Sequence, residues 1–197
     1  MADDISLFPS MDSEGLSFFK DAISHSNCFL EYGCGGSTSY AVNFGKLSAV
    51  ISVDTSKEWV DKVHKSLSHM NTQLLLEHCD LGPIGEWGRP INKDRSGDFW
   101  RYMVTPWRVA RESRLTPDTV LIDGRFRVAA FLYSLLSARV GTLIMFDDYL
   151  NRPHYFVVEN FCRLKEKHGR MGVFIVENNY SLPDIVSAIA EYATVME

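Results

Sequence analysis

The 197-residue chain lacks several features that would place it in a specialised class of protein. It has no apolar run of membrane-spanning length and no Lys/Arg cluster, and 25 acidic residues against 20 basic ones give a net charge of −5. Phosphate contacts need a basic surface, so this charge argues against a nucleic-acid partner, and the missing apolar run argues against a membrane partner. Residues 1–11, MADDISLFPSM, carry acids where a signal peptide has a basic segment, so we expect a cytoplasmic location.

Cysteine is also scarce, and no two of the four cysteines have the C-x-x-C spacing. This pattern predicts reduced packing residues and excludes both a disulfide framework and a zinc site. The four are Cys28, Cys34, Cys79 and Cys162. Hydrophobic residues make up 46% of the chain and charged residues 23%, which is ordinary for a globular protein. We therefore predict a single domain spanning 1–197, and a homo-oligomer remains compatible with the sequence.

Apolar runs alternate with helical patterns along the chain. This order predicts an α/β fold, with a mostly parallel twisted sheet and helices on both faces. The predicted strands are 28–32, 49–54, 73–78, 119–123, 141–147 and 171–177. Helices are predicted over 14–25 and around 183–193, and on three apolar stripes: Trp59, Val63, Leu67 and Met70; Val128, Phe131, Leu132, Leu135 and Leu136; Val158, Phe161 and Leu164.

A glycine-rich turn follows the first predicted strand and carries the most informative motif. Its residues read E-x-G-x-G-x-S, with Glu31, Gly33, Gly35, Gly36 and Ser37. Such a turn presents backbone N–H groups at a helix start, where glycine lets the main chain approach a ligand. Thr38 stands where the dinucleotide fingerprint G-x-G-x-x-G needs glycine, which disfavours nicotinamide and flavin dinucleotides. A carboxylate before the turn also repels phosphate and would favour a cofactor that carries an ammonium group.

The motif resembles the first motif of class I S-adenosylmethionine-dependent methyltransferases. A second apolar run, AVISVD, ends in Asp54, 23 positions after Glu31, which is the spacing expected for a carboxylate that binds ribose hydroxyls. The resemblance implies a three-layer Rossmann-like fold and S-adenosylmethionine as cofactor. It implies that Asp80 reaches toward the adenine amino group and that Asp123 lies near the transferable methyl group. The implied cofactor-binding residues are Glu31, Gly33, Gly35, Gly36, Ser37, Asp54 and Asp80.

The carboxyl-terminal part departs from this family. Its members usually end in an antiparallel hairpin of two strands, and after the strand at 171–177 only a helix can be placed. The sequence therefore predicts that the terminal hairpin is altered or missing.

The segment 82–117 is longer than a simple crossover between two strands needs. One interpretation is a packed helix whose arginines face water. The other is an insertion that acts as a substrate lid, in which Arg101 and Arg108 bind an anionic group of the substrate. Tyr155 is a further candidate for substrate contact.

Acidic residues at strand ends suggest where chemistry takes place. Asp123, Asp147 and Asp148 resemble the Mg²⁺ ligands of small-molecule O-methyltransferases, in which the metal lowers the pKa of a substrate hydroxyl. Alternatively, arginines such as Arg125, Arg127 or Arg152 organise these three carboxylates, or the aspartates cap local backbone.

His154 is the candidate general base because an imidazole titrates in the useful pH range, although a helix cap or a surface position is the other interpretation. Together with Asp123, Asp147 and Asp148 it completes the candidate catalytic set. The leading hypothesis is an S-adenosylmethionine-dependent methyltransferase that acts on a small-molecule acceptor, with O-methylation favoured. The alternative is a non-catalytic methyltransferase-like protein that binds S-adenosylmethionine or S-adenosylhomocysteine.

Overall fold

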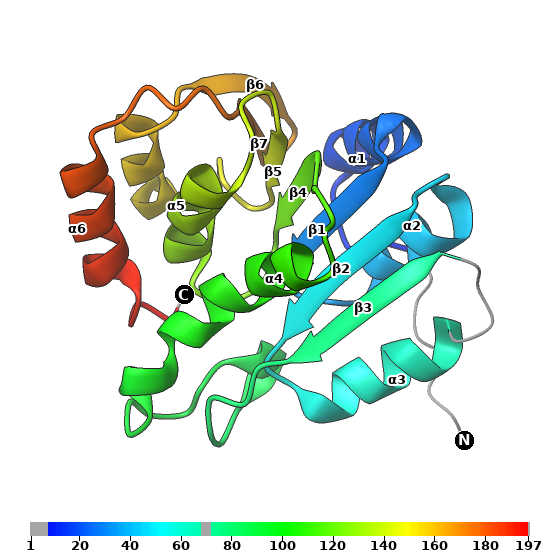
Figure 1. Cartoon of the computed structure of the whole chain (residues 1–197), viewed down its shortest axis with the longest axis horizontal. Helices are drawn as coiled ribbons and strands as arrows, with labels where there is room; N and C mark the ends of the chain where they lie inside the picture. The colour runs from blue at the N-terminus through cyan, green and yellow to red at the C-terminus, as the bar shows by residue number, and fades with distance from the viewer. Residues whose placement is uncertain (1–7, 68–71, 197) are drawn as a thin grey trace.

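One seven-stranded sheet, in the order β3-β2-β1-β4-β5-β7-β6, forms the centre of the computed structural model, which describes residues 8–67 and 72–196 (Figure 1). Strands β1 to β5 pair in parallel, and β7 is antiparallel to both β5 and β6. The strands are β1 Cys28–Tyr32, β2 Ala49–Asp54, β3 Gln73–His78, β4 Thr119–Ile122, β5 Leu143–Phe146, β6 Leu164–His168 and β7 Met171–Ile175. This topology confirms the predicted Rossmann-like methyltransferase fold.

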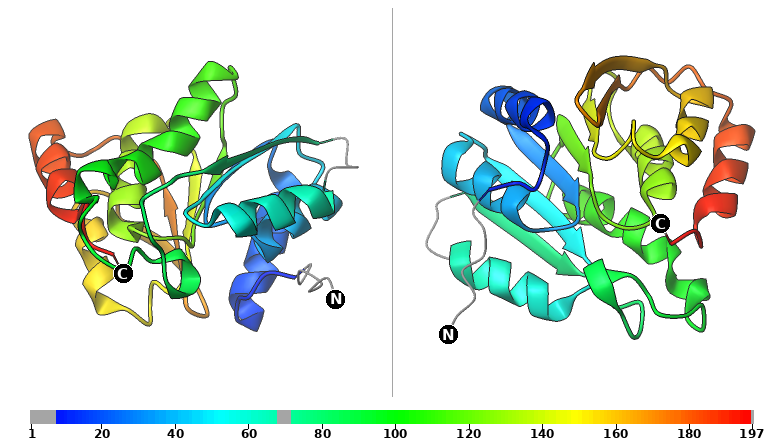
Figure 2. Two further views of the ribbon diagram at one scale, coloured as in Figure 1. Left: turned by 90° about the horizontal axis from the view of Figure 1, so that it is seen from below. Right: turned by 180° about the vertical axis from the view of Figure 1, so that it is seen from behind.

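Helices cover both faces of the sheet, so the molecule has three layers (Figure 2). One face carries α1 Ser13–His25, α2 Gly36–Phe44 and α3 Lys57–Leu67; the other carries α4 Trp100–Glu112, α5 Arg127–Ser137 and α6 Leu182–Tyr192. Successive side chains of a strand point to opposite faces of the sheet. Phe29 therefore packs in the core beneath α1, α2 and α3, and Leu30 packs in the core beneath α4, α5 and α6. Among the described residues, no helix has the length and apolar character needed to cross a membrane.

Two of the predicted helices, at 14–25 and on the stripe that begins at Trp59, form as α1 and α3. Asp12 caps α1 by accepting a hydrogen bond from the Gly15 N–H at 2.8 Å. The α3 stripe of Trp59, Val63 and Leu67 lies on a helix that ends at Leu67, and Met70, its last predicted member, lies outside the described residues.

The predicted loss of the terminal hairpin is wrong, because β6 and β7 form it. The missed strand, β6, has the sequence LKEKH at the edge of the sheet, so it lacks an apolar run. The predicted helix at Val158, Phe161 and Leu164 is also incorrect. A 3₁₀ helix, η3, occupies Pro153–Asn160 and contains only Val158 of this stripe, whereas Phe161 follows its end and Leu164 begins β6.

The segment 82–117 divides into two parts. Its second part contains α4, a covering helix of the sheet, which buries Tyr102, Met103 and Trp107. Its first part, residues 82–99, forms an irregular loop with two short 3₁₀ turns, η1 Glu86–Gly88 and η2 Ser96–Asp98. This loop precedes α4 in the crossover from β3 to β4.

Candidate functional site

A cavity of about 690 Å³ opens at the carboxyl ends of β1, β2, β4 and β5. Parallel strands of an open sheet place ligands at this edge. Its wall combines the glycine-rich turn after β1, Asp54 at the end of β2, residues 123–125 after β4 and residues 147–148 after β5. Four predicted site regions therefore meet in one space.

The glycine-rich turn contributes main chain to the cavity wall. Gly33 has φ +90°, and a Cβ there would lie 3.0 Å from the Gly124 Cα, so the turns after β1 and β4 are in direct contact. Thr38, the residue that breaks the dinucleotide fingerprint, accepts a hydrogen bond from the Gly35 N–H at 2.8 Å at the start of α2. The cavity lining includes Gly33, Gly35, Gly36 and Ser37, as predicted from the motif.

Glu31 lies beneath this turn and is not part of the cavity wall. It is fully buried and accepts hydrogen bonds from the Ser37 hydroxyl at 2.6 Å and from the Thr38 hydroxyl. Burial raises the pKa of Glu31 to about 8, although these hydroxyls oppose the shift. The structure therefore gives Glu31 the geometry of a residue that positions the turn.

Asp54 ties the end of β2 to the turn. Its carboxylate accepts hydrogen bonds from the backbone N–H groups of Cys34 at 3.2 Å and Ser56 at 2.8 Å. Burial raises the pKa of Asp54, and these backbone donors counteract part of that shift. Asp80, by contrast, lies outside the cavity and pairs with Arg95 at 3.0 Å, so the structure does not bring it to the predicted adenine position.

Two tryptophans that were not predicted as site residues from the sequence, Trp59 and Trp87, line the same end of the cavity. Trp59 donates its indole N–H to the Cys34 carbonyl at 2.6 Å. The hydroxyl of Thr55 donates to the Gly88 carbonyl at 2.6 Å and so holds the 84–90 turn beside Asp54. This turn presents Trp87, which is 87% exposed and has φ +57°. In the sequence, Trp87 lies in the turn-rich stretch GPIGEWGRP at the start of the 82–117 segment, which was considered as a substrate lid.

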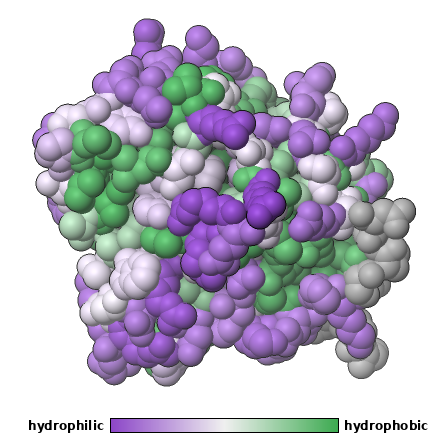
Figure 3. Space-filling view, viewed as in Figure 1, coloured by the Kyte–Doolittle hydropathy of each residue, from purple (hydrophilic) through white to green (hydrophobic). Residues whose placement is uncertain are grey.

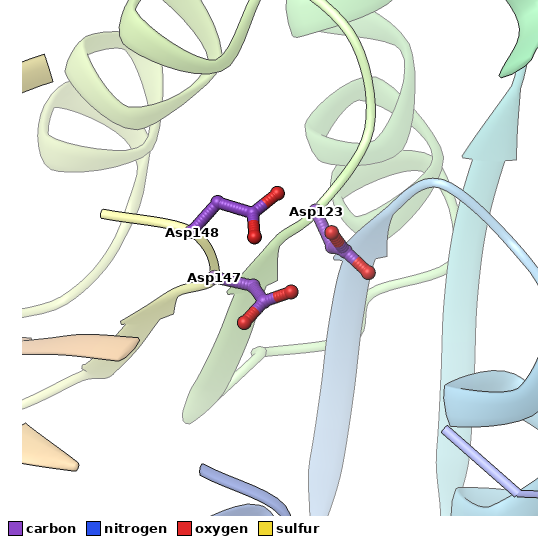
Figure 4. A group of neighbouring side chains, drawn as sticks. All are labelled: Asp123, Asp147 and Asp148. Atoms are coloured by element: carbon purple, nitrogen blue, oxygen red, sulfur yellow. The ribbon is translucent and has the colours of Figure 1, made fainter. Parts of the chain in front are cut away.

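The opposite end of the cavity holds the three predicted carboxylates. Asp123 follows β4, and Asp147 and Asp148 follow β5, with the carboxyl groups pointing into one shared space (Figure 4). One oxygen from each lies within 4.8 Å of the others. The convergence of these side chains agrees with their predicted location at adjacent strand ends.

Arginines neutralise this carboxylate cluster. Arg127, at the start of α5, pairs with Asp123 at 3.1 Å and Asp148 at 3.3 Å. Arg170 pairs with Asp147 at 2.8 Å and Asp148 at 3.0 Å, and Arg152 pairs with Asp148 at 2.9 Å. Arg127 and Arg152 belong to the arginine alternative drawn from the sequence, but Arg170 does not. It comes from the β6–β7 turn, which the sequence pattern did not reveal.

The donor set does not fit a resident Mg²⁺. Guanidinium groups already contact five of the six carboxylate oxygens of Asp123, Asp147 and Asp148. Mg²⁺ requires near-ideal octahedral coordination by oxygen, and these oxygens would first have to leave their arginine partners.

Burial raises the pKa of Asp123 to about 7, with Arg127 opposing the shift and Asp147 reinforcing it.

The predicted base and substrate contacts lie away from the cavity. His154 is exposed, and its ring packs against Tyr155 at 4.4 Å between centroids. Tyr155 is fully buried, and its hydroxyl accepts a hydrogen bond from Arg152 at 3.1 Å. Arg101 and Arg108 are exposed on α4, over which the surface is strongly hydrophilic (Figure 3). The geometry therefore does not support a catalytic His154 or a substrate contact by Tyr155, Arg101 or Arg108.

Comparison with solved structures identifies the family. A methyltransferase-like protein from Silicibacter pomeroyi is 30% identical with a TM-score of 0.86, and the match covers 95% of this chain and 98% of that one. A methyltransferase from Geobacter sulfurreducens is 13% identical, with a TM-score of 0.51 over 85% of this chain and 80% of its own. An RNA methyltransferase from Salinibacter ruber, solved with S-adenosyl-L-homocysteine, is 11% identical with a TM-score of 0.50, covering 88% and 97% of the two chains.

The last two similarities concern the fold alone. Neither a protein-family model nor a curated protein matches the sequence. The 30% identity to the Silicibacter pomeroyi protein, however, extends over nearly the whole of both chains, and the two structures superpose with a TM-score of 0.86. The chain belongs to the class I S-adenosylmethionine-dependent methyltransferase superfamily.

Proposed function

We propose that the protein is an S-adenosylmethionine-dependent methyltransferase that methylates a hydroxyl group of a small molecule. The observation that carries this proposal is the meeting of the glycine-rich turn, Asp54 and Asp123 in a single cavity. Its volume of about 690 Å³ falls within the usual range for small-molecule sites.

The cofactor end of the cavity fits an adenosyl sulfonium compound. The main chain of Gly33 to Ser37 can approach a ligand closely because three of these five residues are glycines. Asp54 accepts one hydrogen bond on each carboxylate oxygen, so each oxygen keeps a lone pair for a ribose hydroxyl. When bound, S-adenosylmethionine supplies an electrophilic methyl group, and alignment is then the main task of the protein.

Asp123 is the best placed general base. It lies at the end of β4, lines the cavity and keeps 31% of its side chain exposed to it. Its pKa of about 7 leaves a substantial ionised fraction at neutral pH and gives the carboxylate more basicity than an ordinary aspartate has. Removal of the hydroxyl proton by Asp123 would replace the metal-assisted step suggested by the sequence.

Calorimetric titration with S-adenosylmethionine, S-adenosylhomocysteine and NAD tests the cofactor assignment. We expect the first two to bind and NAD to give no heat of binding; tighter binding of NAD would overturn the proposal.

Methyl transfer from labelled S-adenosylmethionine to a panel of small hydroxyl compounds, with and without chelator, tests the reaction. Binding of S-adenosylhomocysteine with no transfer to any acceptor would favour the non-catalytic alternative.

A further inference from the structure

Four arginines line the acceptor end of the cavity, together with the three aspartates of the carboxylate cluster. They are Arg125, Arg127, Arg152 and Arg170. This end therefore carries more positive than negative side chains, although the chain as a whole has a net charge of −5. Protonation of Asp123, whose pKa is about 7, makes the imbalance larger at neutral pH.

Two of these arginines are committed to holding the structure. Arg127 is buried, with 4% of its side chain exposed, and donates to the Gly124 and Asp147 carbonyls at 3.0 and 2.8 Å in addition to its ion pairs. Arg170 joins Asp147 to the amino-terminal segment by donating to the Ser10 carbonyl at 2.6 Å. Their donors are directed at protein atoms.

The other two line the same end of the cavity. Arg152 donates to Asp148, which Arg127 and Arg170 also contact, and to the Tyr155 hydroxyl, and 37% of its side chain stays exposed. Arg125 follows directly after Gly124 at the end of β4, and its backbone N–H lies 3.4 Å from the Tyr102 hydroxyl. Burial lowers the pKa of Arg125, and the like charges of Arg127 and Arg152 lower it further.

Resting on the function proposed above, we propose that the acceptor carries an oxyanion, a carboxylate or a phosphate, which Arg125 and Arg152 bind at the Asp123 end of the cavity. A guanidinium fork matches the geometry of both oxyanions, and an anion between the two side chains would relieve their mutual repulsion. The anionic group would anchor the acceptor while its hydroxyl lies toward Asp123. A neutral analogue would lose this anchor.

The test uses the full chain saturated with S-adenosylhomocysteine and titrated at constant ionic strength with inorganic phosphate and, separately, with acetate. We expect at least one of the two anions to bind, and the tighter one identifies the class of oxyanion. The variants Arg125→Gln and Arg152→Gln should each weaken that binding at least tenfold while S-adenosylhomocysteine still binds. The control Arg139→Gln removes a charge from an exposed position beyond the far end of α5 and should change nothing.

Each outcome separates this inference from the proposed function. If S-adenosylhomocysteine binds but neither anion does, the acceptor class is wrong and the methyltransferase proposal stands. Equal anion affinity in Arg152→Gln and the wild type would also overturn the assignment. Retained binding of S-adenosylhomocysteine shows that a variant with weakened anion binding is folded. Failure of the wild type to bind S-adenosylhomocysteine would overturn the proposed function itself.

Discussion

The two ends of the cavity differ in the groups that line them: main chain at one end and charged side chains at the other. The cofactor end presents main chain from the Gly33–Ser37 turn, held from below by Glu31 and tied to Asp54 through backbone N–H groups. The acceptor end presents seven charged side chains, three aspartates and four arginines, from the segments after β4, after β5 and between β6 and β7. Backbone geometry suits a cofactor common to a whole superfamily, whereas an arrangement of side-chain charges can be changed to select one acceptor.

The largest expected effect lies at the acceptor end. If Asp123 is the base, Asp123→Asn should lower kcat for a hydroxyl acceptor about a hundredfold or more. The pH profile gives a second readout, because the base must be ionised. Wild-type activity should therefore rise with pH through about 7, and this rise should be absent in the variant. His154→Ala, which changes an exposed residue outside the cavity, should keep kcat within about twofold.

A profile that is flat in the wild type, or a larger loss in His154→Ala than in Asp123→Asn, would transfer the base role away from Asp123. Activity should survive chelation because arginines neutralise the carboxylates. Loss of activity in chelator that Mg²⁺ restores would contradict the absence of a metal role.

The second largest effect is expected where Gly124 contacts Gly33 and joins the two ends of the cavity. A Cβ at Gly124 would lie 2.0 Å from the Tyr102 hydroxyl and 2.9 Å from the Gly33 nitrogen. Gly124→Ala should therefore lower the free energy of unfolding by about 1–3 kcal/mol in urea denaturation, as for overpacking elsewhere. Gly97→Ala is the matched control because nothing lies within 4 Å of its added Cβ. Equal stability of the two variants would show that the ends are not rigidly coupled.

Asp54→Ala tests the cofactor end. Loss of a charged hydrogen-bond partner should weaken S-adenosylhomocysteine binding by about 1–3 kcal/mol in calorimetry. Asp80→Ala removes an exposed carboxylate outside the cavity and should leave the affinity unchanged. The reverse result would place the ribose at the end of β3 and return Asp80 to the role expected from the sequence.

Glu31→Gln tests whether the turn is held by a buried acid. Since burial raises the pKa of Glu31 from 4.5 to about 8, the folded state binds the proton more tightly than the unfolded state. The resulting stability is complete below pH 4.5 and is lost as pH rises through about 8. Between pH 5 and 6.5 the wild type should lose about 2 kcal/mol more stability than the variant, measured by urea denaturation. Parallel pH profiles would contradict the raised pKa.

The smallest expected effect concerns Trp87. If this exposed ring stacks on the bound cofactor, Trp87→Ala should weaken S-adenosylhomocysteine binding by about 1 kcal/mol and reduce the fluorescence change on binding. Trp100→Ala removes another exposed tryptophan, one that does not line the cavity. Equal effects of the two substitutions would leave the cofactor end defined by main chain and Asp54 alone.

The cofactor end was largely predictable because its signals are local. Glycines at fixed spacing after an apolar strand determine the turn, and the parallel pairing of β1 with β2 then brings Asp54 beside it. The misplaced residues share a different property. Asp80 and His154 follow strand ends in the sequence, but the local path of the chain turns Asp80 to Arg95 and His154 to solvent. Position along the chain does not specify the direction of a side chain in a loop.

The sequence by itself determined the parallel sheet, the glycine-rich turn and the gathering of carboxylates at one edge, because strand periodicity and glycine conformation act over a few neighbouring residues. Only the tertiary structure decided which distant side chains those carboxylates contact. Arg170 reaches Asp147 because the β6–β7 hairpin folds back beside β5, and Arg127 reaches Asp148 from the start of α5, whereas the pair of Arg127 with Asp123 is local, four positions apart. Ion pairs between side chains distant in sequence depend on the packing of whole elements, and no local pattern records them.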